Sequence, residues 1–97
     1  MTDADEGEGE DFNKAEGATT ALDVCEHVVR ALVDDPDAVR IEPEERRRGG
    51  YILRVNVAPD DMGRVIGRRG RTAQAVRTLV AAAAVRDGVE VDVDFVD

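Results

Sequence analysis

The sequence predicts an α+β domain with the element order α-β-β-α-α-β, in which a three-stranded mixed sheet has its helices packed on one face. Three observations lead to this prediction. Apolar residues recur at helical spacing in residues 20–32 and 71–86. They alternate with polar residues in 51–57 and 89–95, which is typical of strands. Two glycines separate a short helical segment from the long one.

Residues 1–18 are predicted to lie outside this fold. They carry seven acids against one base, Lys14, and their single aromatic residue is Phe12. Such a segment cannot bury enough apolar surface to offset the entropy lost on ordering it. We therefore expect a disordered acidic tail over 1–18 and one folded domain over 19–97, in a chain of 97 residues with net charge −9.

The first half of the domain reads as one helix and a hairpin. A helix is expected from Thr20, with Asp23 as the capping partner, and it stops before Pro36 because proline cannot continue the hydrogen-bond ladder. Its apolar stripe consists of Leu22, Cys25, Val29 and Leu32. A short strand over 38–42, a polar loop over 43–50 and a strand over 51–57 should form an antiparallel hairpin.

The second half reads as two helices and a strand. A short helix is expected over 61–66 and a longer one over 71–86, ended by Asp87-Gly88, with a last strand over 89–95. On the long helix we place five apolar residues on the packed side: Ala73, Val76, Leu79, Val80 and Ala83. A helical crossover makes the last two strands parallel, with a right-handed connection.

The loop Gly67-Arg68-Arg69-Gly70 holds the residues with the clearest chemistry. Glycines let the chain turn sharply, and Gly70 opens directly into the long helix. The first N–H groups of a helix lack partners, and this end of the helix dipole is positive. A phosphate is well received there. Segment 62–86 contains six arginines and no acid, so the local field around the loop is positive despite the acidic chain.

The segment 57–70 resembles the strand end, short helix and G-x-x-G loop of a KH domain, and the element order resembles the type II KH fold. The length resembles the small stand-alone bacterial KH proteins of the KhpA family. The resemblance implies single-stranded RNA clamped at the loop, about four nucleotides long. The residues it assigns to RNA binding are Arg64, Ile66, Gly67, Arg68, Arg69, Gly70 and Arg71, with Val55 or Val57 as a further wall of the groove.

The resemblance also implies homodimers or pairing with a larger Jag-type KH protein, and roles in RNA metabolism, cell shape and cell-wall biogenesis. The folded part has only two aromatic residues, Tyr51 and Phe95, so stacking of bases on rings is a poor explanation for binding. Few apolar residues are expected to be exposed on the long helix, which argues mildly against a large interface there.

The sequence gives little support for a nucleotide-binding loop or a metal site. Nucleotide-binding loops of the G-x-G-x-x-G or P-loop type would need glycine at Val65. Cys25 and His27 point to different sides of a helix, so we expect a core cysteine, a surface histidine and no metal or cofactor. The strand-face acids Asp92 and Asp94 are expected to be solvated, and Arg46-Arg47-Arg48 either widens the RNA surface or forms a solvated loop.

We therefore predict a cytoplasmic RNA-binding module that is not an enzyme and does not enter membranes, with RNA chaperone as a candidate role. The alternative is a protein-interaction adaptor that dimerises through the KH fold and binds RNA incidentally. A third hypothesis concerns the acidic tail, which would compete with RNA for the arginines.

Overall fold

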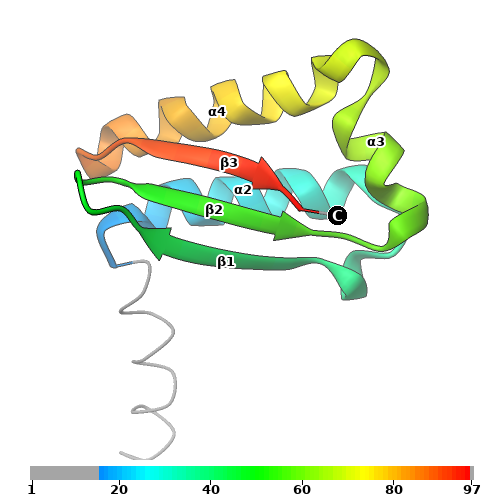
Figure 1. Ribbon diagram of the computed structural model, residues 1–97, viewed down its shortest axis with the longest axis horizontal. Helices are drawn as coiled ribbons and strands as arrows, with labels where there is room; N and C mark the ends of the chain where they lie inside the picture. Colours follow the sequence, from blue (N-terminus) through cyan, green and yellow to red (C-terminus); the bar gives the residue numbers. More distant parts are fainter. Residues whose placement is uncertain (1–15, 97) are drawn as a thin grey trace, which may run out of the picture.

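The computed structural model describes residues 16–96, which form a three-stranded sheet covered on one face by two long helices (Figure 1). The strand order is β1-β2-β3, with β1 (Arg40–Glu45) antiparallel to β2 (Tyr51–Asn56), and β2 parallel to β3 (Val91–Phe95). The helices α2 (Thr19–Leu32) and α4 (Arg71–Asp87) pack against each other behind the sheet. The predicted α+β class, the α-β-β-α-α-β order and the mixed sheet of the type II KH fold are confirmed.

The start of α2 differs from the expectation. The helix begins at Thr19 with Ala18 as its N-cap residue, which forms no side-chain cap bond, so Asp23 does not lie three residues after the N-cap as predicted. Instead, the carboxylate of Asp87, at the end of α4, accepts hydrogen bonds from the backbone N–H of Thr20 at 3.2 Å and of Ala21 at 3.0 Å. A carboxylate is stabilised at a helix N-terminus, and here it joins the two helices.

The folded unit begins before Thr19. Residues Glu16–Ala18 form a 3-10 turn, Ala18 is fully buried, and the backbone N–H of Gly17 donates to the Tyr51 hydroxyl. Residues 17 and 18, which the prediction assigned to the tail, therefore contact the folded part of the chain. The rest of the predicted tail lies outside the described residues.

The first strand is displaced from its predicted position. It runs from Arg40 to Glu45, not over 38–42, and it includes Pro43 opposite Leu53 of β2. Proline is tolerated because β1 is an edge strand, where one row of backbone groups needs no partner. The polar loop is accordingly shorter than predicted and occupies residues 46–50.

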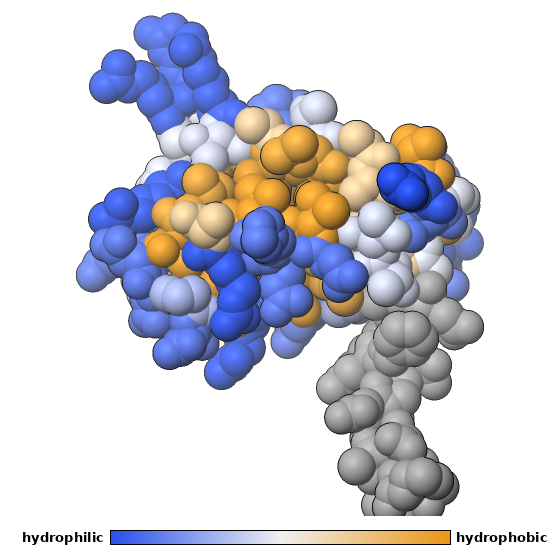
Figure 2. Space-filling model, turned by 180° about the vertical axis from the view of Figure 1, so that it is seen from behind, coloured by the Kyte–Doolittle hydropathy of each residue, from blue (hydrophilic) through white to orange (hydrophobic). Residues whose placement is uncertain are grey.

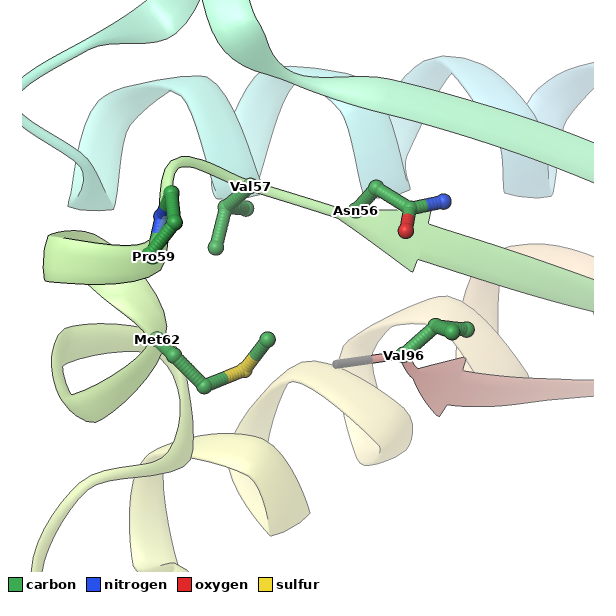
Figure 3. A pocket seen from close by; sticks show the side chains of 5 residues that line it. All are labelled: Asn56, Val57, Pro59, Met62 and Val96. Carbon is green, nitrogen blue, oxygen red and sulfur yellow. The ribbon is translucent and has the colours of Figure 1, made fainter.

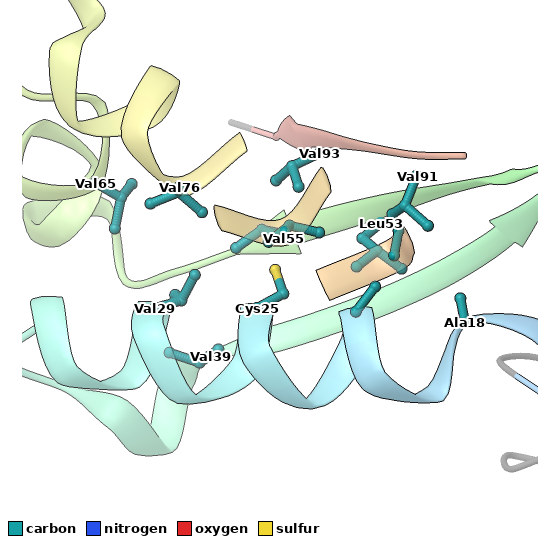
Figure 4. Packing of buried hydrophobic residues seen from close by; sticks show 13 residues of the cluster. Ala18, Cys25, Val29, Val39, Leu53, Val55, Val65, Val76, Val91 and Val93 are labelled. Carbon is teal, nitrogen blue, oxygen red and sulfur yellow. The ribbon is translucent and has the colours of Figure 1, made fainter. Parts of the chain in front are cut away.

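The core lies between the sheet and the two helices (Figure 4). Alternation on β2 and β3 points their buried side chains toward the helices: Leu53, Val55, Val91 and Val93. From α2 the core receives Ala21, Cys25 and Val29, and from α4 it receives Ala73, Val76, Val80 and Ala84. Small residues on both helices let them approach the sheet closely.

The packed side of α4 is narrower than predicted. Leu79 is 50% exposed and Ala83 is only half-buried, so the placement of Leu79 in the core is wrong. Successive helical residues are about 100° apart, which turns Leu79 away from the sheet when Val80 faces it. Val85, at 76% exposed, lies on the solvent side as well.

The short elements lead into the loop. A 3-10 turn at Pro59–Asp61 precedes α3 (Met62–Ile66), and a 3-10 turn at Arg68–Gly70 precedes α4. Figure 1 shows this connection at the end of the molecule remote from the β1–β2 turn. Within residues 16–96, no helix is long and apolar enough to cross a membrane.

Candidate nucleic-acid interface

Three of the four residues that connect α3 to α4 have a positive backbone angle φ. These are Gly67 at 75°, Arg69 at 58° and Gly70 at 74°. The backbone N–H of Gly67 donates to the carbonyl of Gly63 at 2.8 Å, and that of Gly70 donates to the carbonyl of Gly67 at 3.1 Å. The loop is thus a defined turn with its own hydrogen bonds.

The two glycines are needed for different reasons. A Cβ on Gly67 would lie 2.9 Å from the backbone nitrogen of Thr72, closer than such atoms approach in proteins, so this position is sterically closed. A Cβ on Gly70 would meet nothing within 4 Å, so only its left-handed backbone disfavours a side chain there. The open space beside Gly70 leaves the backbone accessible at the point where α4 begins.

The start of α4 has no side-chain cap. Its N-cap residue is Gly70, which has no side chain to accept the first N–H groups of the helix. A helix start of this kind favours an external anion, because its backbone N–H groups and the helix dipole both attract negative charge. The N–H groups of Gly70 and Arg71 donate to the carbonyls of Gly67 and Arg68, so these two donors are already paired.

Arg68, Arg69 and Arg71 lie next to Gly70 in the chain, and all three are exposed. None of the acids within residues 16–96 forms an ion pair with them. Arg69 holds a left-handed conformation, which costs a non-glycine residue roughly 1–2 kcal/mol. Strain of this kind is concentrated at ligand-binding sites, where it fixes groups in a binding geometry.

Arg64, the remaining arginine predicted to bind RNA, has a different environment. Its Nη2 lies 2.8 Å from Asp34, and its Nε lies 3.1 Å from the buried carboxylate of Asp61. The pKa of Asp61 is lowered mainly by the backbone N–H of Asp34; burial opposes this, while the N–H of Asp35 and Arg64 reinforce it. The charge of Arg64 is therefore largely balanced within the protein.

An apolar hollow of about 190 Å³ opens between α3 and the ends of β2 and β3 (Figure 3). It is lined by Asn56, Val57, Pro59, Met62 and Val96. Of the two valines considered for the groove, Val57 lines this hollow and Val55 is fully buried in the core. Ile66 is half-buried and packs against the core beside the loop, outside the hollow.

One arginine beside this region was not singled out from the sequence. Arg77 of α4 donates from Nε to the backbone carbonyl of Val93 at 3.1 Å, and its guanidinium carbon lies 5.8 Å from the centroid of the Phe95 ring. Only its place in the acid-free arginine segment could have drawn attention to it. The contact with β3 depends on tertiary structure.

Comparison with known proteins decides the family. The family model for the KhpA/KhpB KH domain matches residues 23–95. The chain belongs to this KH-domain family. It is similar to proteins named RNA-binding protein KhpA from Mycobacterium leprae, at 53% identity over 78% of this chain and 92% of the relative, and from Leifsonia xyli, at 56% over 73% and 90%. The corresponding Streptomyces coelicolor protein is 51% identical over 77% and 92%.

The remaining polar residues that the sequence singled out take structural or surface positions in this KhpA-family fold. Cys25 is buried, which raises the pKa of its thiol to about 12, with a smaller contribution from Glu26. His27 is exposed. The strand-face acids are not simply solvated, because Asp92 pairs with Arg46, and Asp94 lies 3.0 Å from Arg54.

Proposed function

We propose that this protein binds single-stranded RNA by receiving the phosphate backbone at the start of α4. The observation that carries the proposal is the start of α4 at Gly70, which has no side-chain cap. The exposed Arg68, Arg69 and Arg71 lie next to it, and none of them pairs with an acid within residues 16–96. Relatives that cover most of this chain are named RNA-binding proteins. KH domains clamp about four nucleotides at such loops.

The proposed contacts divide by chemistry. Gly67 and Gly70 let the RNA backbone approach the protein backbone, and the guanidinium groups supply charge and forked donors to phosphate oxygens. The apolar side chains of Ile66, Val57 and Met62 offer surface to bases that leave the loop. Because phosphate contacts carry no sequence information, this part of the site tolerates many sequences, as an RNA chaperone requires.

The decisive experiment uses two matched double variants. R68D/R69D should abolish binding of a fluorescent single-stranded RNA, whereas R47D/R48D, which removes two exposed arginines from the β1–β2 turn, should reduce affinity only slightly. Binding is measured by fluorescence anisotropy at several salt concentrations, and folding by circular dichroism. Equal RNA affinity of wild type and a folded R68D/R69D variant would overturn the proposal. A large loss of RNA affinity in R47D/R48D would indicate that RNA binds at the β1–β2 turn instead.

A second candidate function, pairing of two copies through the helical face, is favoured by one specific observation. Figure 2 shows apolar side chains gathered across the face formed by α2 and α4. The large hydrophobic residues exposed within 16–96 are Leu79 and Val85, and both lie on α4. Two copies related by a two-fold axis would bury the same patch on both.

Sedimentation analysis of wild type and L79D, each with and without RNA, separates the two functions. A wild-type dimer that L79D converts to a monomer supports pairing, and retained RNA affinity in that monomer shows that binding does not require it. A monomeric wild type leaves a different KH protein, such as the Jag-type partner implied by the resemblance, as the ligand of this face. We also propose a cytoplasmic location, which an RNA partner supports, together with the roles in cell shape and cell-wall biogenesis that the resemblance implies.

A further inference from the structure

Arg77 is held in one orientation by two contacts. Its Nε donates to the backbone carbonyl of Val93 at 3.1 Å, and its guanidinium group lies against the ring of Phe95, 5.8 Å from the centroid. The residue is nevertheless exposed. A guanidinium group is planar and has a rigid fork of donors, so fixing Nε also fixes the directions of both terminal amino groups.

The contacts that hold Arg77 leave its charge and its terminal donors unused. Both partners are neutral, and no acid within residues 16–96 forms an ion pair with it. Arg64 differs in this respect, because two carboxylates take its donors. Arg77 is thus an oriented cation whose free amino groups are available to a ligand.

Its position follows from the topology. Arg77 is seven residues after Gly70 on the same helix, which corresponds to about 10 Å along the helix axis. It faces β3, which is the edge strand of the sheet on the side next to α4. An RNA strand whose phosphate is bound at the start of α4 therefore has Arg77 within reach of its neighbouring nucleotides.

We propose that Arg77 reads a nucleobase that presents two adjacent acceptors, namely guanine through O6 and N7 or cytosine through O2 and N3. Two parallel N–H donors match such a pair, and adenine and uracil lack it because a donor group interrupts their acceptors. The Phe95 ring, whose centroid lies 5.8 Å from the guanidinium carbon, helps to hold the group in place for such a contact. This inference rests on the proposed RNA-binding function and adds a base preference to it.

The preference can be measured with oligouridines of about eight nucleotides that carry one central guanine, cytosine or adenine. Wild type should bind the guanine or the cytosine oligomer about ten-fold more tightly than the adenine oligomer, which is the discrimination expected of one bidentate contact. R77K keeps the charge and removes the fork, so it should equalise the three affinities while binding to plain oligouridine stays within about two-fold. R86K, at the far end of the same helix, is the control and should retain the preference.

Each outcome decides a different point. Absence of RNA binding in wild type would remove the proposed function itself. Equal binding of all oligomers by wild type, an undiminished preference in R77K, or an equal loss for all oligomers in R77K would overturn the role of Arg77 and leave the loop site standing. If R77K does not fold, the wild-type Arg77 Nε–Hε resonance provides the test. It should shift with the guanine or cytosine oligomer and not with the adenine one, and equal shifts with all three would overturn the inference.

Discussion

The carboxylate of Asp61 accepts a hydrogen bond from the backbone N–H of Asp34 at 3.1 Å, across the junction between the end of α2 and the start of α3. The same carboxylate accepts the N–H of Asp35 at 3.1 Å and pairs with Arg64 one turn later. Asp61 is 2% exposed, so these donors replace the water that would otherwise solvate its charge. It ties the α2–β1 connection to α3, the helix that leads into the loop Gly67–Gly70.

Replacing Asp61 by Asn should therefore destabilise the protein and loosen the loop. An amide has one acceptor oxygen in place of two and carries no charge, so at least one backbone N–H and the Arg64 guanidinium lose their partner. The urea midpoint of unfolding should fall clearly for D61N and stay nearly unchanged for D60N, whose carboxylate is exposed. Equal midpoints for the two variants would contradict this role of Asp61.

The stability of the protein should depend on pH through Asp61 and Asp87. Burial works to raise the pKa of Asp87, but hydrogen bonds from Ala21 and Thr20 leave it lowered, and the pKa of Asp61 is also lowered. A carboxyl with a lowered folded-state pKa stabilises the fold fully above its unfolded value of about 4, and this stabilisation is lost as pH falls through the folded value. The thermal midpoint should thus drop below about pH 4, and less steeply in a D61N/D87N variant. A parallel pH profile for that variant would show that other groups dominate.

The capping of α2 by Asp87, at the end of α4, can be tested with a matched pair of variants. D87A removes the acceptor used by the N–H groups of Thr20 and Ala21 and should cost about 1 kcal/mol, as the loss of a helix cap does. D23A, at the position where a local cap was expected, should leave the free energy of unfolding almost unchanged, because the N–H of Thr20 is bonded to Asp87 instead. Chemical denaturation measures both values, and a larger effect of D23A would contradict the long-range cap.

The fold followed from the sequence wherever one residue pattern sufficed. Alternation in β2 and β3, the helical stripe of α2, and the glycines around the loop are local signals that tertiary contacts reinforce. The first strand was misplaced because Pro43 normally ends a strand, and only its edge position makes it acceptable. Whether a strand lies at an edge is a property of the assembled sheet.

The sequence predicts the arrangement of the candidate-site residues inside the loop better than the environment of the arginines beside it. The glycines and arginines of residues 67–71 are adjacent in sequence, so their shared position follows directly. The roles of Arg64 and Arg77 depend on residues about thirty and sixteen positions away, Asp34 and Val93, which no periodicity joins. Leu79 was placed in the core because helical spacing defines a stripe but not its width, and the sheet here accommodates a narrow one.

The two glycines of the loop should respond differently to alanine. G70A places a Cβ in open space and should cost about 1–2 kcal/mol from its left-handed backbone alone. G67A adds a collision with the Thr72 backbone at the start of α4, so it should displace the loop and weaken RNA binding more than G70A does. Denaturation and fluorescence anisotropy on both variants test this order. A larger loss of RNA affinity in G70A than in G67A would instead show that the RNA backbone occupies the space beside Gly70.

Removing the acidic tail should tighten RNA binding at low salt. The first fifteen residues carry six acids and one base, and an extended chain of that length spans about 50 Å, whereas α4 measures about 25 Å from its Asp87 end to the loop. The deletion has to stop at residue 15, because Ala18 is buried and Gly17 is bonded to Tyr51. Surface charges are screened beyond about 8 Å at physiological salt, so the gain in RNA affinity should shrink as salt rises.

A variant that keeps the tail but has its acids changed to amides should show the same gain in RNA affinity if charge is the cause. Unchanged RNA affinity in both proteins at low salt would show that the tail does not compete for the arginines.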